Sequence, residues 1–155
     1  MTDKTPQQEY DEMFTALQTD DKYAAAMAYV MKQDFLSYMV TMFYLINCQR
    51  MMLKDFHLTV IKKLQGLVDG TNEKRNLALC LPVGSGKSLL TEYFISWCFA
   101  RSRDNAFVYT SHSEDLITKM SAEIRSICTF PMWQRLFGWV LKKDDRQKTN
   151  FSFEG

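Results

Sequence analysis

The stretch "LCLPVGSGKSLLTEYF", from Leu79 to Phe94, sets the expectations for the fold. It opens with apolar residues, passes through a glycine-rich centre and continues with a pattern typical of a helix. A glycine-rich loop between a strand and a helix binds phosphate, because backbone N–H groups and the positive end of the helix face the anion. In this chain of 155 residues the loop begins only about halfway along.

The side chains of this loop suit a nucleoside triphosphate. Gly84, Ser85 and Gly86 supply a flexible backbone, Lys87 can reach the outer phosphates, and Ser88 can ligate Mg²⁺, as in a Walker A motif. We therefore expect ATP and Mg²⁺ as cofactors, with Ser88 as the metal ligand and Lys87 as the catalytic residue. The loop residues expected to bind the nucleotide are Pro82, Val83, Gly84, Ser85, Gly86, Lys87, Ser88 and Leu89.

The first position of the motif departs from the strict pattern. A glycine is usual there, whereas this chain has Leu81 followed by Pro82. The alternative is a chance Gly-x-Gly-Lys-Ser in a loop, or a helix start with an incidental Lys–Ser pair. The expected strand before the motif and the expected helix after it favour a true phosphate loop, the name used below for residues 81–88.

The flanking sequence predicts an α/β fold. Apolar runs at 76–81 and 105–110 predict two buried parallel strands, each followed by a helix, and a weak strand is expected at the end of the chain. Ser111 is the expected N-cap of the second helix, and Pro131 starts a short one. The chain up to about residue 52 is typical of helix, and a further helix is expected from Asp55 to a stop at Gly70.

These elements predict a parallel sheet of the P-loop NTPase type, flanked by helices and preceded by a helical N-terminal cap. We expect residues 1–54 to form the cap and residues 55–155 to form the first part of an ATPase domain.

Composition excludes several classes of protein. With 46% hydrophobic residues and a formal net charge of +1, the chain is neither disordered nor a polybasic nucleic-acid binder. The uncharged run 35–49 is too short to cross a bilayer, so no membrane partner is expected. Two of the four cysteines, Cys80 and Cys98, lie within apolar runs. We expect the cysteines to be small buried hydrophobic residues in a reducing compartment.

The second acidic motif of a working NTPase is not found after the loop. Such an enzyme needs an Asp or Glu at the end of an apolar strand to help hold magnesium, and usually a carboxylate that orients water. Glu114 and Asp115 come too far beyond 105–110, and two lysines precede Asp144. We therefore expect this chain to bind ATP without efficient hydrolysis, and the catalytic acid to lie outside it.

The order of several segments resembles the N-terminal ATPase region of the large terminase subunit of tailed bacteriophages. The resemblance covers about residue 34 to residue 155 and is carried by "DFH" (55–57), "NLALCLPVGSGKSLL" (76–90), "AFVYTSHSEDLITKMSAEIRSI" (106–127) and "FPMWQRLFG" (130–138). It implies a motor that uses ATP hydrolysis to move double-stranded DNA into a capsid. The implied partners are a portal protein, a small terminase subunit and further copies in a ring, in the host bacterial cytoplasm.

The resemblance also implies roles for residues outside the loop. Phe56 and His57 would flank the adenine, and residues 111–113 would form a nucleotide-coupled or DNA-facing loop. The alternatives are a core role for Phe56, a capping or surface role for His57, and local backbone bonding for His112. Gly84 stands where many members of the family have an arginine.

Two other functions stay open. One is a different P-loop DNA motor, such as a helicase. The other is a non-catalytic remnant that acts as a nucleotide- or protein-binding module.

Overall fold

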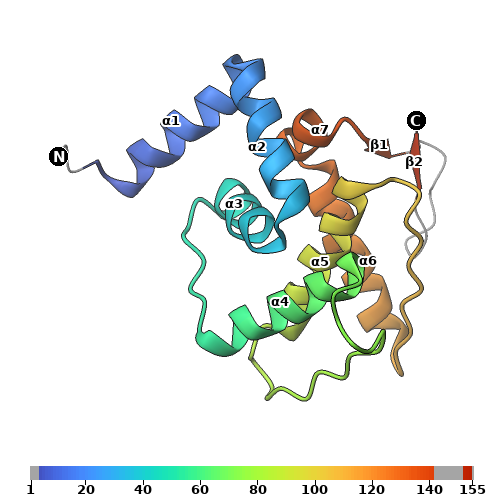
Figure 1. Cartoon of the computed structure of the whole chain (residues 1–155). Helices are drawn as coiled ribbons and strands as arrows, with labels where there is room; N and C mark the ends of the chain where they lie inside the picture. Colours follow the sequence, from blue (N-terminus) through green and yellow to red (C-terminus); the bar gives the residue numbers. More distant parts are fainter. Residues whose placement is uncertain (1–3, 142–151, 155) are drawn as a thin grey trace.

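The computed structural model describes residues 4–141 and 152–154 (Figure 1). In this part of the chain there are seven helices and one pair of two-residue strands. The elements are α1 Pro6–Thr19, α2 Asp21–Gln33, α3 Phe35–Asn47, α4 Asp55–Asp69, α5 Lys87–Arg101, α6 Glu114–Thr129, α7 Pro131–Phe137, β1 Val140–Leu141 and β2 Phe153–Glu154.

Two aspartates divide the N-terminal helical sequence into three helices. Asp20 accepts hydrogen bonds from the backbone N–H groups of Lys22 and Tyr23, and therefore caps α2. Asp34 does the same for α3 by accepting a bond from the Ser37 N–H at 2.7 Å. The helical character predicted for the chain up to about residue 52 is confirmed, as three separate helices.

Most helix ends after residue 54 also follow the predicted signals. Gly70 ends α4 in the left-handed conformation at φ 69°, and α7 begins at Pro131. The predicted N-cap of α6 is wrong, because the cap is Ser113. Ser111 lies two residues earlier, and its Oγ is 3.5 Å from the Ser113 backbone nitrogen.

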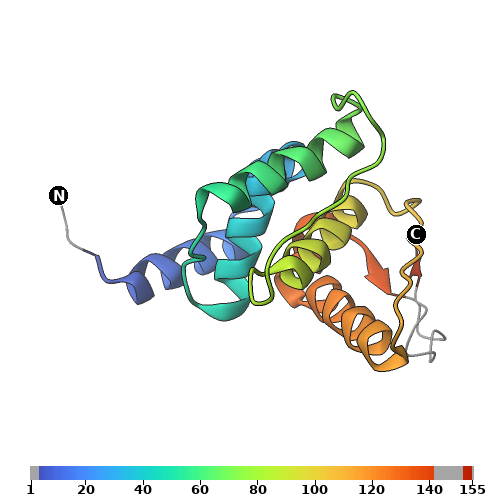
Figure 2. The same cartoon turned by 90° about the horizontal axis from the view of Figure 1, so that it is seen from below.

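The predicted α/β fold with a parallel sheet of the P-loop NTPase type is wrong, because the described part of the chain is mostly helical. The segments 76–81 and 105–110 are extended, but neither is hydrogen-bonded as a strand; the one ladder in the described residues joins β1 to β2, antiparallel. Figure 2 shows the two segments on different sides of α5. Leu77, Leu79 and Leu81 are half-buried against the helical core, whereas Ala78 and Cys80 are exposed. Burial on one side by helices therefore holds segment 76–81 extended without a neighbouring strand.

The core is built around α5, which packs against α2, α3, α4 and α6. A buried hydrogen-bond chain joins three helices: the Tyr38 hydroxyl donates to Ser96 Oγ at 2.8 Å and accepts from Trp133 Nε1 at 2.9 Å. Residues before and after residue 54 contribute to one continuous hydrophobic cluster. The helical lead-in thus shares its core with the rest of the chain.

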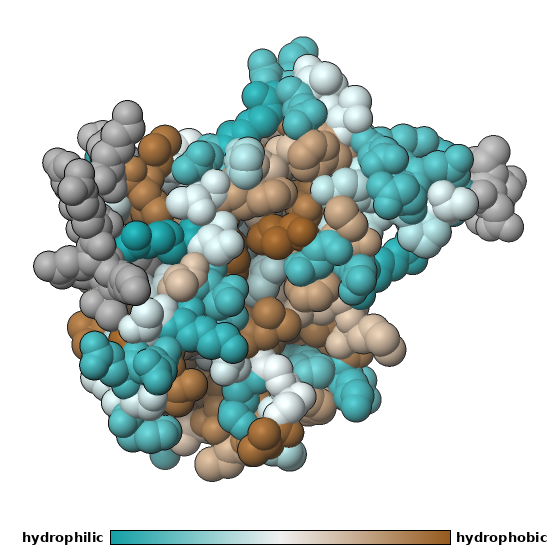
Figure 3. Space-filling model, turned by 180° about the vertical axis from the view of Figure 1, so that it is seen from behind, coloured by the Kyte–Doolittle hydropathy of each residue, from teal (hydrophilic) through white to brown (hydrophobic). Residues whose placement is uncertain are grey.

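Some apolar side chains remain at the surface. Val83 and Val108 are almost fully exposed; Val83 lies in the turn of the phosphate loop and Val108 in the connection between α5 and α6. On the face shown in Figure 3, hydrophobic areas are interspersed with hydrophilic ones. Among residues 4–141 and 152–154, no helix has the length and apolarity required to cross a membrane.

Thiol labelling would test the exposed outer side of segment 76–81. Cys48 and Cys80 are exposed whereas Cys98 and Cys128 are buried, so the prediction of buried cysteines is wrong for the first two and confirmed for the other two. Burial raises the pKa of the Cys98 thiol to about 12, which keeps it protonated and unreactive at pH 8. We expect two fast-reacting thiols in the folded chain and four after denaturation, measured with Ellman's reagent.

Cys80→Ser is the matched control for this experiment. It should leave a single fast thiol, since only Cys48 and Cys80 are accessible. An unchanged count of fast thiols in this variant would mean that the outer side of the segment is covered.

Candidate functional site

The phosphate loop leads directly into α5. Gly84 and Gly86 have φ values of +79° and +77°, a backbone conformation that glycine adopts without strain. Gly86 is the N-cap residue of α5, and no side chain caps the helix. Within the described chain, the N–H groups of Gly86, Lys87 and Ser88 find no backbone acceptor. They are therefore available to an anion at the positive end of the helix.

The Lys87 side chain is hydrogen-bonded to the first residues of the phosphate loop. Its Nζ donates to the carbonyl oxygens of Leu81 and Pro82, the second at 2.9 Å. These two carbonyls are the hydrogen-bond acceptors of the ammonium group in the structure. A bound triphosphate would offer stronger acceptors within reach of the same side chain, because charge-assisted hydrogen bonds are stronger than those to neutral carbonyls.

Ser88 is exposed in the first turn of α5. No group of three or more His, Cys, Asp or Glu in the described residues is arranged to hold a metal ion. Mg²⁺ in nucleotide sites takes most of its ligands from water and phosphate oxygens. The Ser88 hydroxyl could therefore be the single protein ligand of Mg²⁺, with phosphate and water oxygens as the other ligands.

His57 lies against the phosphate loop, although it comes from the first turn of α4. Its Nε2 is 3.1 Å from the Ser85 carbonyl oxygen, and its Nδ1 is 2.9 Å from the Lys54 backbone nitrogen. The Phe56 ring is next to the imidazole, with ring centroids 3.9 Å apart, and is partly exposed. The structure thus brings His57 to the loop with Phe56 beside it, while adenine contact stays a prediction.

The other predicted site residues have fewer contacts that would support a role in nucleotide binding. Pro82 and Val83 are exposed at the tip of the loop, and Leu89 is half-buried against the hydrophobic core. His112 is exposed between Ser111 and Ser113, just before α6. Among the described residues it makes no hydrogen bond to the phosphate loop, so a coupled role for residues 111–113 stays a prediction.

Glu92 is a half-buried carboxylate of α5 that the sequence analysis did not single out. Burial raises its pKa above the ordinary value of 4.5, Glu123 raises it further, and Lys119 lowers it. Ionisation of Glu92 therefore costs free energy in the folded state. Its stabilising contribution is present while Glu92 is protonated and is lost as pH rises through the raised pKa.

Replacing Glu92 by glutamine should raise the Tm at pH 7, because the amide carries no charge. The gain should shrink as pH falls below 4.5, where the parent carboxyl is protonated as well. Thermal unfolding at pH 7 and at a pH below 4.5 would measure the gain in Tm. Glu73→Gln, at an exposed position, is the control. A gain that is equal at both pH values would contradict the proposed cause.

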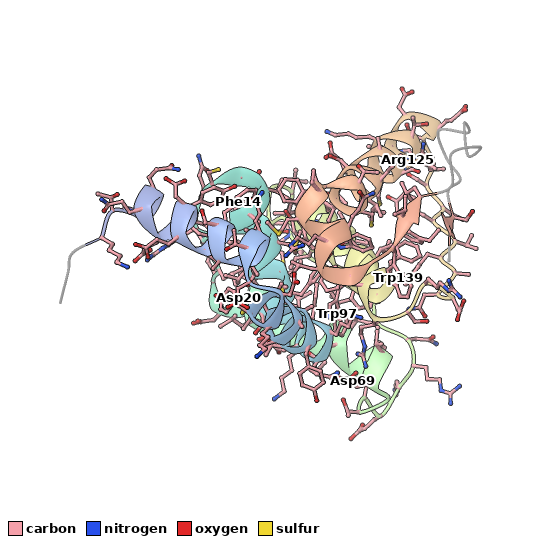
Figure 4. The ribbon with its side chains drawn as sticks, turned by 90° about the horizontal axis from the view of Figure 1, so that it is seen from above. Phe14, Asp20, Asp69, Trp97, Arg125 and Trp139 are labelled. Atoms are coloured by element: carbon pink, nitrogen blue, oxygen red, sulfur yellow. The ribbon has the colours of Figure 1, made fainter. Side chains whose placement is uncertain are left out.

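Figure 4 labels Asp69 of α4 and Trp97 of α5, which both contact Arg101 at the C-terminal end of α5. Arg101 forms an ion pair with Asp69 at 2.6 Å and lies over the Trp97 ring at 4.9 Å from its centroid. The contacts of Arg101 fix α4 and α5 side by side. His57, at the start of α4, and the phosphate loop, at the start of α5, are linked independently by the contact with Ser85.

Comparisons with protein-family models, with curated proteins and with solved structures give no match. The terminase resemblance therefore rests on the segments quoted above.

Proposed function

We propose that the chain binds a nucleoside triphosphate with Mg²⁺ through residues 81–88, as the ATP-binding part of a DNA-packaging motor similar to a terminase large subunit. The observation that carries the nucleotide part is the loop itself. Two left-handed glycines precede α5, no side chain caps the start of that helix, and Lys87 donates to the loop carbonyls of Leu81 and Pro82. The packaging part is supported by the resemblance in segments 55–57, 76–90, 106–127 and 130–138.

Each loop group would have a defined task. The amides of Gly86, Lys87 and Ser88 would bind phosphate oxygens, with the α5 dipole adding to the attraction. The Lys87 ammonium would leave the carbonyls of Leu81 and Pro82 and neutralise the β- and γ-phosphates. Ser88 would ligate Mg²⁺, which bridges those phosphates and offsets charge that develops during transfer.

Efficient hydrolysis also requires a carboxylate that orients water. No aspartate or glutamate among residues 4–141 and 152–154 is hydrogen-bonded to the phosphate loop. The chain alone should therefore bind ATP and turn it over slowly. In the proposed motor, the portal protein, the small terminase subunit and neighbouring copies in a ring would be the partners, and double-stranded DNA the substrate.

The nucleotide part is tested by calorimetry with MgATP, MgADP and adenosine. We expect MgATP to bind and adenosine to bind far more weakly, because the phosphates supply the contacts with the loop. Folding would be verified by circular dichroism in the same samples. A folded chain that does not bind MgATP at millimolar concentration would contradict the proposal and favour the protein-binding alternative.

The DNA part needs a separate measurement. Fluorescence anisotropy with double- and single-stranded oligonucleotides of equal length, over a range of salt concentrations, would compare the two substrates. The packaging proposal predicts tighter binding to the duplex in the presence of MgATP. Preference for single strands would favour the helicase alternative, and ATP binding without DNA binding would favour the non-catalytic module.

A further inference from the structure

His57 joins the start of α4 to the phosphate loop through both of its ring nitrogens. The Lys54 backbone N–H can only donate, so the Nδ1 that it contacts at 2.9 Å must be an acceptor without a proton. The neutral ring then carries its proton on Nε2, which donates to the Ser85 carbonyl oxygen at 3.1 Å. One imidazole thus caps α4 and holds the loop.

The bond to Ser85 sets the direction of the next amide. The C=O of Ser85 and the N–H of Gly86 belong to one planar trans peptide and point in opposite directions. Because the C=O is held toward His57, the Gly86 N–H must face away from the imidazole. This N–H is one of the amides at the start of α5 that have no backbone acceptor among the described residues.

Gly86 makes such a restraint necessary. With φ at +77° and no side chain, it can rotate into alternative conformations at little cost, and the peptide between Ser85 and Gly86 could turn over. The turned peptide would point a carbonyl oxygen at the anion. The imidazole lies against the loop, since a Cβ built on Gly86 would be 3.8 Å from His57 Nε2.

We infer that His57 is a positioning residue that pre-organises the phosphate loop, by holding the Ser85–Gly86 peptide with its N–H directed at the nucleotide phosphate. This inference rests on the proposed function. The restraint lowers the entropic cost of binding, because the loop is already ordered in the binding conformation. His57 acts from α4 and needs no contact of its own with the nucleotide.

Three variants separate the cap from the loop contact. Asparagine keeps a carbonyl oxygen near the position of Nδ1, so His57→Asn should still cap α4 but fall short of Ser85. Glutamine carries an acceptor and a donor on a longer side chain, so His57→Gln should restore both contacts. In α1 of the same chain, Gln8 already caps in this way, accepting from the Thr5 N–H at 2.9 Å. His57→Ala removes both contacts.

Calorimetry with MgATP should show binding about three- to tenfold weaker in His57→Asn and His57→Ala than in the parent chain, the range expected for one hydrogen bond. His57→Gln should bind within about twofold of the parent. Thermal unfolding should rank the variants differently, with His57→Ala the least stable because it alone loses the cap. If the role of His57 were purely structural, the MgATP affinities of the variants would rank in the same order as their thermal stabilities.

A spectroscopic measurement tests the inference without nucleotide. Long-range ¹H–¹⁵N NMR of the imidazole should show the Nε2–H tautomer in the free chain, and the Gly86 amide should shift in His57→Asn. The opposite tautomer would overturn the inference.

The binding outcomes separate the two proposals. If the parent and His57→Asn bind MgATP equally while Lys87→Ala does not, the inference is wrong and the proposed function stands. If the folded parent does not bind MgATP, the proposed function fails and the inference fails with it.

Discussion

Replacing Lys87 by alanine should weaken MgATP binding roughly 10- to 100-fold, the effect expected from losing charged hydrogen bonds of about 1.5–3 kcal/mol. The ammonium is the one cationic side chain of the loop at 81–88. Its hydrogen-bond partners are two main-chain carbonyls, of Leu81 and Pro82. Pro82 is exposed and Leu81 is half-buried, so water can satisfy these carbonyls in the variant. The change in folding stability should therefore be small.

The comparison requires an exposed lysine outside the phosphate loop. Lys62→Ala removes one positive charge from an exposed site on α4 and should leave affinity unchanged. Calorimetry gives the affinities, and thermal unfolding verifies that both variants are folded. Equal affinity of Lys87→Ala and the parent chain would exclude Lys87 as the phosphate ligand. Equal losses in the two variants would indicate a general effect of charge.

Replacing Trp97 by alanine should destabilise the chain by about 3–5 kcal/mol, the usual cost of deleting a buried tryptophan. Trp97 is fully buried on α5, with the Phe35 ring centroid 5.1 Å away. Its Nε1 donates to the Met31 carbonyl oxygen at 2.8 Å, near the C-terminal end of α2, where carbonyls lack helical partners. The Tm should fall by about 6–20 °C, given the expected 2–4 °C for each kcal/mol in a chain of this size.

A pair of conservative substitutions would isolate the hydrogen bond from the packing. Trp97→Phe keeps much of the apolar contact but leaves the Met31 carbonyl unpaired, at a cost of about 1–3 kcal/mol. Trp139→Phe removes a buried Nε1–H that has no partner among the described residues, and should cost much less. Figure 4 labels both tryptophans.

Differential scanning calorimetry would compare these variants under the same conditions. If Trp97→Phe is as stable as the parent, its bond to α2 contributes nothing. If Trp139→Phe loses as much stability as Trp97→Phe, the absence of a partner for Trp139 is contradicted.

The helices after residue 54 could largely be predicted because their signals are local. Gly70, Pro131 and the glycine pair of the phosphate loop act within one or two turns of their own position. The N-cap of α6 was misplaced by two residues, since Ser111 and Ser113 carry the same cap chemistry and the sequence does not rank them.

The strands could not be predicted by the same reasoning. An apolar run such as 76–81 has the composition of a buried strand, but a strand is completed only by hydrogen bonds from another segment. In the described structure helices cover one side of this run, so its half-buried leucines alternate with exposed residues and Cys80 is accessible. The contact between His57 and Ser85 was missed for a related reason, since the two residues are 28 positions apart.

The sequence was sufficient to predict most helices after residue 54 and the place of the glycine-rich loop before α5. The lack of strand pairing for segments 76–81 and 105–110 within the described residues, the core that the helical lead-in shares with α5, and the contact of His57 with Ser85 became visible only in the folded chain. The physical reason is the range of the interactions. A helix and its caps are satisfied within a few residues, whereas strand pairing, burial and a side chain that reaches a distant carbonyl depend on how the whole chain packs.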